Sequence, residues 1–449
     1  GDYVIVAEPY KGFPADNAGL KAGDILLEID GKSVKGKSTQ DVSSVLKGQP
    51  GVEVNLLIER PGTDKLIEKT FTREEVKVKS IPYMGMVDDG IAYVRLRSFT
   101  RNCANEVKEA IKQLKDENDV KGLVLDLRSN PGGLLNESVS LCNLFIDKNQ
   151  EVVSTKGKIK DWEKSYKTSK EPLDKELPLV VLINQSSASA SEIVSGTMQD
   201  LDRGVIIGKK SFGKGLVQQS RKLSYNSQLK VTVAKYYTPS GRCIQALDYA
   251  HRNDDGSVGK VADSLKTAFQ TKNGRTVYDG GGVDPDIVVE RESYAEIVGS
   301  LVSKQLIFDY ATEFVLENDS IDAPGVYKIT DELYEDFVAF LSDKDYEYET
   351  HTEKELTELI EQAEDEYADF KVDLEALQKK LLSYKEDDIH KYQSQISELI
   401  LSELMARYYY QEGRVIASLA DDVVLDEAIL VLQDSDRYEA ILLGNSDAK

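Results

Sequence analysis

Residues 185–219 read QSSASASEIVSGTMQDLDRGVIIGKKSFGKGLVQQ, and this stretch decides the fold of the chain. It places a serine-rich run directly after the apolar strand pattern of residues 179–183 and directly before an apolar helical pattern that begins at Ile193. A serine in this position lies at the N-terminus of a helix, where free backbone N–H groups and the helix dipole stabilise developing negative charge. The stretch therefore indicates either a simple helix start or a nucleophilic serine.

The two halves of the stretch differ in what they indicate. Residues 189–192 (SASE) have the Ser-x-x-Glu spacing of a capping box, which only starts a helix. The second half adds a candidate catalytic base, because Lys214 lies between Gly213 and Gly215. A lysine desolvated in such a turn can lose its proton and act as a base, and serine with lysine is a known nucleophile pair. Spacing alone leaves several other serines open as the nucleophile: Ser186, Ser187, Ser191 and Ser195.

These residues resemble the active-site region of the carboxyl-terminal processing peptidases, or tail-specific proteases, which are serine peptidases of family S41. The family pattern S-A-S-E followed by F-G-K-G-x-V-Q is present at residues 189–192 and 212–218. The resemblance implies that Ser189 is the nucleophile, that Lys214 is the base and that Gln218 orients the lysine. It implies neither a metal ion nor a cofactor.

A second element, DLRSNPGG at residues 126–133, overlaps the end of a buried strand pattern. Its two glycines allow a tight turn that exposes backbone N–H groups, but it lacks the glycine-lysine-serine/threonine ending of a phosphate loop. It resembles the D-L-R-x-N-x-G-G element of the same peptidases, which supplies half of the oxyanion hole. The resemblance places the donors on the N–H groups of Gly133 and Ala190, with Gly132 as the alternative to Gly133. Two further segments are similar to family elements: YYTPSGRCIQ (236–245) and GGVDPDIVVE (281–290).

The N-terminal segment AGLKAGDILLEIDG, residues 18–31, resembles the signature of a PDZ domain. Such a domain binds a C-terminal peptide by adding it as a strand to an exposed sheet edge. The resemblance implies that Val42 and Val45, on a helix predicted over residues 39–46, line the peptide groove. The alternative is that both are ordinary core positions of an amphipathic helix. We expect the first PDZ strand and the carboxylate-binding loop to lie upstream of Gly1.

The order of the predicted elements indicates an α/β chain with several domains. Residues 91–97, 104–114 and 122–127 read as strand, helix and strand, which predicts a parallel pair joined by a crossover helix. The resemblance implies a crotonase- or ClpP-like architecture for this core. We expect three domains: a PDZ domain at 1–78, an S41-type peptidase core at 79–300 and an acidic helical C-terminal domain at 301–449.

The formal charge of −23 is concentrated at the C-terminal end of the chain. Residues 331–449 hold 32 acidic and 11 basic side chains, so the rest of the chain is nearly neutral. This distribution argues against nucleic acid as a partner, because phosphate binding needs a basic surface. Long acidic helices are usually solvated scaffolds. The alternative is a surface for a partner or for a homo-oligomer, centred on the tyrosines 408–410.

Cysteine and histidine usage excludes several kinds of site. The chain has three scattered cysteines and three histidines, which disfavours a disulfide framework, a zinc site and a Ser-His-Asp triad. No uninterrupted apolar run approaches the length needed to cross a bilayer, and we expect no signal peptide before the first domain. The resemblance implies a periplasmic or other extracytoplasmic location in a bacterial cell envelope.

The sequence therefore predicts a serine endopeptidase that acts on proteins or peptides with an accessible, nonpolar C-terminus. An uncharged Lys214 amine, held in a largely dry cleft, would take the proton of the Ser189 hydroxyl. Two other classes are alternatives: a PDZ-type peptide-binding scaffold with a latent peptidase core, and an acyl-CoA enzyme of the crotonase type. The second shares an oxyanion hole of two backbone N–H groups but leaves Ser189, Lys214 and Gln218 without a role.

Overall fold

The computed structural model consists of two compact units, each assembled from two separate parts of the chain. Unit 1 contains residues 1–78 and 292–420, and unit 2 contains residues 79–291 and 421–449. We describe each unit by itself. The structure describes residues 2–160, 163–225, 227–252, 255–290, 293–366, 368–385 and 387–445.

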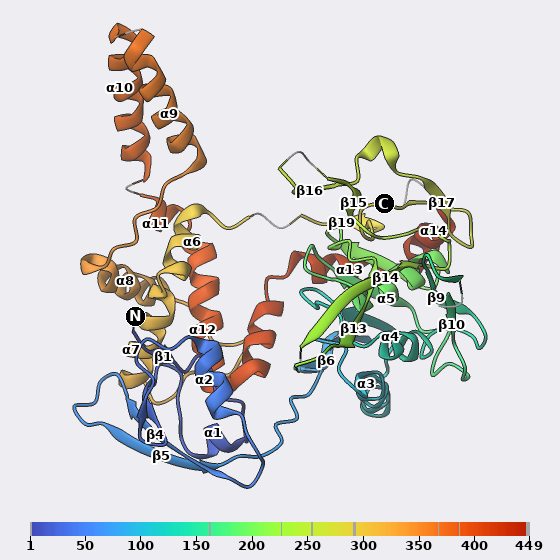
Figure 1. The fold of residues 1–449 in the computed structure, drawn as a ribbon, viewed down its shortest axis with the longest axis horizontal. Coiled ribbons are helices and arrows are strands. Elements are labelled where there is room, and N and C mark those ends of the chain that lie inside the picture. Colours follow the sequence, from blue (N-terminus) through green and yellow to red (C-terminus); the bar gives the residue numbers. More distant parts are fainter. Residues whose placement is uncertain are drawn as a thin grey trace. The chain divides into compact units, whose positions relative to one another are not determined.

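The N-terminal part of unit 1 is an antiparallel sheet with two short helices (Figure 1). The sheet order is β1-β2-β4-β5, with β3 paired to β2. Alternate side chains of β4 are buried in its core, as expected for a half-buried strand. The helix predicted at 39–46 is confirmed as α2, which Ser38 caps. The elements are β1 (Val4–Ile5), α1 (Pro14–Asn17), β2 (Ile25–Ile29), β3 (Lys32–Ser33), α2 (Thr39–Leu46), β4 (Glu53–Glu59) and β5 (Ile67–Thr72).

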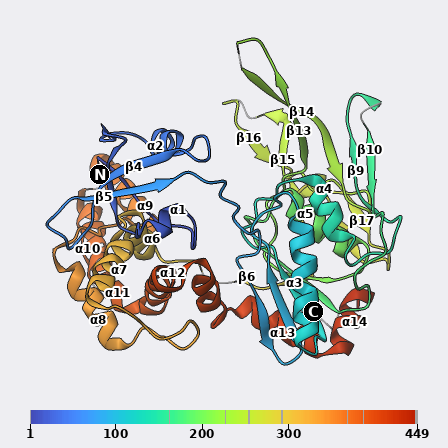
Figure 2. The same cartoon turned by 90° about the horizontal axis from the view of Figure 1, so that it is seen from below.

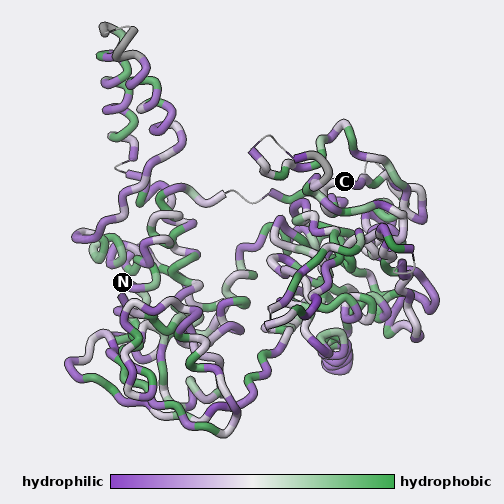
Figure 3. The backbone as a smooth tube through the Cα atoms, in the orientation of Figure 1, coloured by the Kyte–Doolittle hydropathy of each residue, from purple (hydrophilic) through white to green (hydrophobic). Residues whose placement is uncertain are grey.

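The second part of unit 1 is helical. Its core is rich in aromatic side chains, among them the fully buried Tyr334 and Phe337. Two of its helices, α9 and α10, pack against each other as a hairpin that projects from the other helices of the unit (Figure 1) and alternates hydrophilic and hydrophobic residues (Figure 3). The helices are α6 (Glu296–Ser303), α7 (Leu306–Glu317), α8 (Asp331–Phe340), α9 (His351–Glu366), α10 (Ala368–Lys385), α11 (Asp388–Lys391) and α12 (Gln393–Leu419).

The tyrosines 408–410 lie in α12 and bond within unit 1. The Tyr408 hydroxyl donates to the carbonyl of Asn318, and the Tyr409 hydroxyl donates to the carbonyl of Ile321 over 2.7 Å. Tyr410, at φ 58° and ψ −156°, interrupts the helical backbone, and its hydroxyl donates to Asp16 of the N-terminal sheet part over 2.7 Å. The three hydroxyl groups that we expected at a partner surface are therefore bonded within unit 1, and that of Tyr410 joins its two parts.

Unit 2 is built on a six-stranded sheet of order β19-β12-β11-β8-β7-β6. All neighbours in it are parallel except β6 and β7, so the parallel pair predicted around the crossover helix is confirmed. The central strands read as continuous apolar runs because helices cover both faces of a parallel sheet. The strands are β6 (Tyr83–Asp88), β7 (Ile91–Arg95), β8 (Gly122–Asp126), β11 (Leu179–Ile183), β12 (Val205–Gly208) and β19 (Ile287–Val288).

Three helices pack side by side on one face of this sheet: α3 (Cys103–Glu117), α4 (Leu135–Cys142) and α5 (Ala190–Asp200) (Figure 2). Leu123 and Leu125 of β8 face them in the core of the unit. Gly122, which points to the other face by the alternation of a strand, lies against Leu432 of a C-terminal helix. The sheet is therefore covered on both faces.

The helices on that second face come from the end of the chain. We expected residues 301–449 to form one helical domain, but α13 (Val423–Gln433) and α14 (Ser435–Leu443) belong to unit 2. The buried face of α13 contacts β8, β11 and β12, and the Tyr438 hydroxyl accepts the Leu179 N–H over 3.0 Å. The physical reason is the apolar second face of the sheet, which needs a cover. The boundaries expected at residues 78 and 300 stay predictions.

A second, antiparallel sheet in unit 2 has the order β10-β9-β14-β13. Two small ribbons, β15 with β16 and β17 with β18, complete the unit. The strands are β9 (Glu151–Lys156), β10 (Lys164–Lys167), β13 (Leu216–Lys222), β14 (Gln228–Tyr237), β15 (Leu247–Arg252), β16 (Val258–Lys260), β17 (Ala268–Gln270) and β18 (Thr276–Tyr278).

Candidate active site

Ser189 lies at the turn between β11 and α5, at the position that caps the helix. Its backbone has φ 56° and ψ −110°, in the half of φ space that residues other than glycine rarely adopt. Such strain persists only where the surrounding structure imposes it, and it concentrates at functional sites. A serine on a strained strand-to-helix turn presents its hydroxyl at the carboxyl end of the sheet.

Three of the other candidate serines have hydroxyl groups that already donate hydrogen bonds. Ser187 is buried and donates to the carbonyl of Leu127 over 2.8 Å, and Ser191 is buried and donates to the carbonyl of Asn130 over 2.9 Å. Ser195 donates to the carbonyl of Ser191 over 3.0 Å, as a buried helical serine does. Of the candidate serines, only Ser186 and Ser189 keep a hydroxyl that donates no hydrogen bond to a described residue, and the Ser189 oxygen caps α5.

The carboxylate of Glu192 joins the two halves of the stretch. Glu192 is fully buried, and its Oε2 accepts the backbone N–H of Ser189 and of Lys214, each over 2.8 Å. Its Oε1 accepts the N–H of Gly213 and the hydroxyl of Ser211, each over 2.6 Å. Burial raises the pKa of Glu192, while these four hydrogen bonds act in the opposite direction. The sequence indicated Glu192 only as a capping residue, because nothing in its local pattern shows a link to residue 214.

Lys214 has a fixed backbone and an exposed side chain. A Cβ on Gly213 would lie 2.3 Å from the Cβ of Ala246, and a Cβ on Gly215 would lie 2.6 Å from the N of Gln245, so both neighbours must be glycine. The Gly215 N–H donates to Gln245 Oε1 over 2.8 Å. The Lys214 side chain itself is exposed, which differs from the dry cleft that we expected.

Gln218 lies in β13, opposite Thr232 of β14 and next to an irregularity in their pairing. It is exposed and lines a cavity of about 660 Å³ together with Leu216 and Cys243. No hydrogen bond joins the side chains of the three described residues Ser189, Lys214 and Gln218. The structure therefore brings the backbones of Ser189 and Lys214 to one carboxylate but leaves the side chains apart. Catalytic hydrogen bonds often tighten only when substrate binds.

The segment 128–133, which we call the glycine loop, lies directly against Ser189. A Cβ on Gly132 would lie 2.9 Å from the Ser189 Cβ and 2.9 Å from the Ala190 N. The Gly132 N–H donates to Asn130 Oδ1 over 2.9 Å, whereas the N–H groups of Gly133 and Ala190 have no partner among the described residues. Two free N–H groups beside a serine can together stabilise an oxyanion.

Asn130 holds the glycine loop on the start of α5. Its carbonyl accepts the Ala188 N–H over 3.0 Å and the Ser191 hydroxyl over 2.9 Å, and its side chain donates to the carbonyl of Leu96 over 2.8 Å. Asn130 is fully buried, so each of these bonds is made away from water. The motif at 126–133 contained Asn130, but no local pattern showed that it reaches Leu96, directly after β7, and α5.

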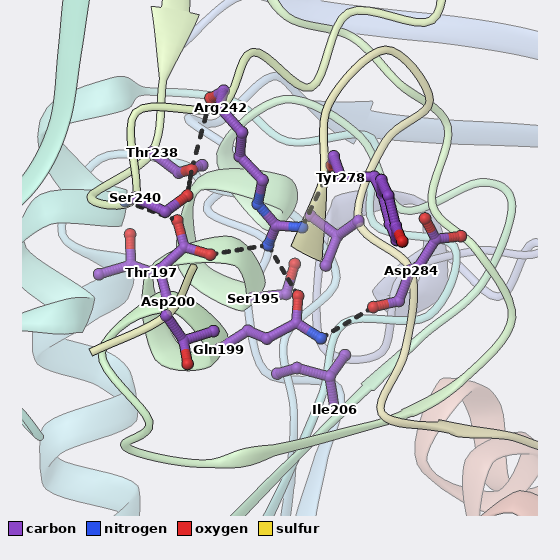
Figure 4. Close-up of polar contacts among 12 residues, drawn as sticks. Ser195, Thr197, Gln199, Asp200, Ile206, Thr238, Ser240, Arg242, Tyr278 and Asp284 are labelled. Carbon is purple, nitrogen blue, oxygen red and sulfur yellow. Dashed lines mark hydrogen bonds and ion pairs between the residues drawn. The ribbon is translucent and has the colours of Figure 1, made fainter. Parts of the chain in front are cut away.

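The other end of α5 anchors the segment that supports Lys214 (Figure 4). Arg242 is fully buried, and its Nη2 forms an ion pair with Asp200 Oδ1 over 2.8 Å and donates to Gln199 Oε1 over 2.7 Å. Both partners lie in the last turn of α5, where the helix dipole also stabilises a positive charge. Arg242 thereby fixes the segment that carries Gln245, whose Oε1 accepts the Gly215 N–H.

A cavity of about 620 Å³ lies beside α2 in unit 1. Val42 is 3% exposed, lines this cavity and also belongs to the core of the sheet part. Val45 is 47% exposed and does not line this cavity. The roles of Val42 and Val45 in peptide binding stay predictions.

Within the described ranges, no helix combines the length and the apolar character needed to cross a membrane. No group of three or more His, Cys, Asp or Glu side chains is placed to hold a metal ion in the part of the chain that the structure describes.

Comparison with known families matches three segments. Residues 90–250 match the model of Peptidase family S41, residues 5–60 match that of the PDZ domain, and residues 297–432 match that of the probable PDZ-protease C-terminal helical domain.

Two curated proteins and one solved structure are similar to parts of this chain. A carboxy-terminal-processing protease of Bartonella bacilliformis is 41% identical over 247 residues, which cover 54% of this chain and 56% of that protein. A probable CtpA-like serine protease of Staphylococcus aureus is 38% identical over 246 residues, covering 54% and 48%. A solved structure of a photosystem II D1 C-terminal processing protease is 30% identical, covers 65% of this chain and 69% of that one, and has a TM-score of 0.37. The chain spans about half the length of the curated relatives that it matches.

Proposed function

The chain belongs to peptidase family S41, and on that premise we propose that it is a serine endopeptidase of the C-terminal processing type. Ser189 attacks the scissile carbonyl, and the uncharged amine of Lys214 takes the serine proton and later gives it to the leaving amine. Gln218 orients the lysine. No metal ion takes part in these steps.

The observation that carries this proposal is the carboxylate of Glu192, which holds the backbones of Ser189 and Lys214 at once. Twenty-four residues of chain separate the two positions, and a structural role for either alone would not require a shared buried acceptor. The glycine loop supports the same site, because Gly132 packs on Ser189. The N–H groups of Gly133 and Ala190 then stabilise the tetrahedral oxyanion, and each donor contributes about 3 kcal/mol.

Because the Lys214 side chain is exposed, the proposed mechanism needs one step before the proton transfer from Ser189. The Lys214 amine makes no hydrogen bond with the Ser189 hydroxyl, so we propose that the catalytic pair forms only after water has left the cleft. We propose that the substrate chain fills the cleft, excludes water and brings the Lys214 amine to the Ser189 hydroxyl. The enzyme is then inactive at rest and is assembled by its substrate.

We propose that unit 1 selects the substrate. The apolar groove beside α2 suits a nonpolar chain end, and we propose that substrates are proteins or peptides with an accessible, nonpolar C-terminus. The domain boundaries at residues 78 and 300, a bacterial cell-envelope location and a homo-oligomer through the C-terminal helices belong to the same proposal.

The test is hydrolysis of an unfolded protein, read as fragments by mass spectrometry. Wild type should cleave, and Ser189→Ala and Lys214→Ala should not cleave while keeping the wild-type circular dichroism. Ser186→Ala is the matched control, because it removes the neighbouring free hydroxyl and should cleave as wild type does. A fluorophosphonate probe should label Ser189 in the full chain.

The exposed Lys214 also favours a second candidate, a PDZ-type scaffold whose peptidase core stays latent. That candidate predicts peptide binding without fragments and without fluorophosphonate labelling at any peptide concentration. Coenzyme A binding, measured by calorimetry, would instead revive an acyl-CoA enzyme.

A further inference from the structure

The guanidinium of Arg128 stands between two carboxylates from distant parts of the chain. Its Nε and Nη2 bond Asp126, over 3.0 Å to Oδ1 and 2.7 Å to Oδ2. Its Nη1 bonds Asp422 Oδ1 over 2.9 Å, and its Nη2 lies 2.6 Å from Asp422 Oδ2. The side chains of Arg128, Asp126 and Asp422 are 16%, 0% and 10% exposed, so water screens little of this charge network.

Arg128 is the first residue of the glycine loop, and the backbone that follows it is strained. Ser129 has φ 58°, and its N–H donates to Asn184 Oδ1 over 2.9 Å. A residue keeps such a conformation only when its neighbours fix it from both sides. The Arg128 side chain fixes the backbone before Ser129, and Asn130 fixes the backbone after it. The position of Gly133 therefore depends on where the guanidinium of Arg128 is held.

Asp422 caps α13 with the same carboxylate. Its Oδ1 accepts the N–H groups of Val424 and Leu425, over 3.1 Å and 3.3 Å. A helix cap needs only a neutral acceptor, and asparagine caps as well as aspartate. The dipole of α13 favours the charge of Asp422 at this position, and the ion pair with Arg128 is the second interaction that uses it.

We propose that Asp422 is a positioning residue for the proposed peptidase reaction, which acts through Arg128 to hold the glycine loop and the Gly133 N–H beside Ser189. This inference rests on the proposed function and extends it to a residue 289 positions after Gly133 in the chain. The carboxylate does not touch substrate. Its effect is confined to the transition state, because the oxyanion exists only there.

The test is the substitution Asp422→Asn in the full chain. Asparagine keeps the α13 cap and removes the charge, while Asp126 still neutralises Arg128, so no buried charge is left without a partner. We expect kcat for a short peptide substrate to fall about 10- to 50-fold with KM unchanged, since a displaced donor costs less than the 10²- to 10³-fold loss of a deleted one.

The matched control is Asp434→Asn. Asp434 caps α14 through the Arg437 N–H over 2.9 Å, so this substitution makes the same chemical change at a neighbouring helix start that does not reach Arg128. We expect wild-type kcat for Asp434→Asn at the same melting temperature as Asp422→Asn.

A second measurement separates positioning from a general loss of structure. A peptide boronate adds to an active-site serine and places an oxygen where the oxyanion forms, so its Ki should rise by the factor by which kcat/KM falls. Equal kcat and equal boronate Ki in Asp422→Asn and wild type would overturn the inference and leave the proposed function intact. A wild-type chain that neither cleaves peptide nor binds the boronate would overturn the proposed function itself, and the inference with it.

Discussion

Replacing Glu192 by glutamine tests whether one carboxylate aligns nucleophile and base. The carboxylate accepts four hydrogen bonds, two on each oxygen. Glutamine has the same shape but offers one oxygen and one NH₂ group. With its oxygen toward the N–H groups of Ser189 and Lys214, its NH₂ faces Ser211 and Gly213. The Ser211 hydroxyl can turn and accept, whereas the Gly213 N–H is left buried without an acceptor.

The magnitude follows from this count. One buried N–H without an acceptor costs about 1–3 kcal/mol, two bonds to a charged acceptor become bonds to a neutral one of roughly half the strength, and the bond with Ser211 reverses its direction. The substitution also removes a buried charge, whose unfavourable desolvation is visible in the raised pKa of Glu192. The net loss of unfolding free energy should be about 2–4 kcal/mol, which leaves a chain of ordinary stability folded.

The catalytic effect should exceed the loss of stability. A shift of about 1 Å in the backbone of Ser189 or Lys214 costs about 10²-fold in rate, so kcat/KM for a short peptide should fall about 10²-fold in Glu192→Gln. The assay compares kcat/KM and the urea midpoint of unfolding at one temperature. Glu353→Gln is the matched control, because Glu353 is also buried, accepts the Thr350 N–H over 2.6 Å and lies in unit 1.

Glu353→Gln should lower the urea midpoint and leave kcat/KM unchanged. The reasoning is refuted if Glu192→Gln cleaves the peptide at the wild-type rate while the loss of stability is present. In that case the carboxylate serves only the fold.

Three further predictions concern the glycine loop, β13 and the buried acid. Gly132→Ala should abolish cleavage and lower the melting temperature, because Gly132 has φ 95° and its Cβ would lie 2.6 Å from a backbone oxygen. Gln218→Ala should lower kcat at least tenfold with unchanged stability, while Gln219→Ala, on the neighbouring residue of the strand, should cleave normally; equal rates for both would contradict the role of Gln218. Burial alone would raise the pKa of Asp126, but the charge and hydrogen bonds of Arg128 outweigh burial and lower that pKa. The ionised Asp126 therefore stabilises the fold above its unfolded-state pKa, and this stabilisation is lost as pH falls through the folded-state pKa. Urea midpoints measured between pH 6 and pH 3 should therefore fall less steeply in Asp126→Asn than in wild type.

Part of the fold could be predicted because it depends on patterns within a few residues. The runs 123–125 and 179–183 are apolar throughout because both faces of the sheet are covered, and they read as buried strands. The helix after Ser189 and the glycines around Lys214 are also local features, since a cap and a tight turn depend on adjacent residues. The prediction for Tyr408 to Tyr410 lacked such a basis, since their hydroxyl partners lie at least 88 residues away.

By itself the sequence determined the parallel strands of the core, the serine at the start of α5 and the glycine-bracketed lysine. Only the tertiary structure decided that Glu192 reaches Lys214, that Gly132 packs on Ser189 and that α13 covers the sheet. It also decided that the Lys214 side chain is exposed. The physical reason is the strand order, which places β8 beside β11 and β11 beside β12 although 52 residues separate the first two strands. The contacts between the loops that follow these strands exist only once the sheet has formed, and no periodicity along the chain encodes them.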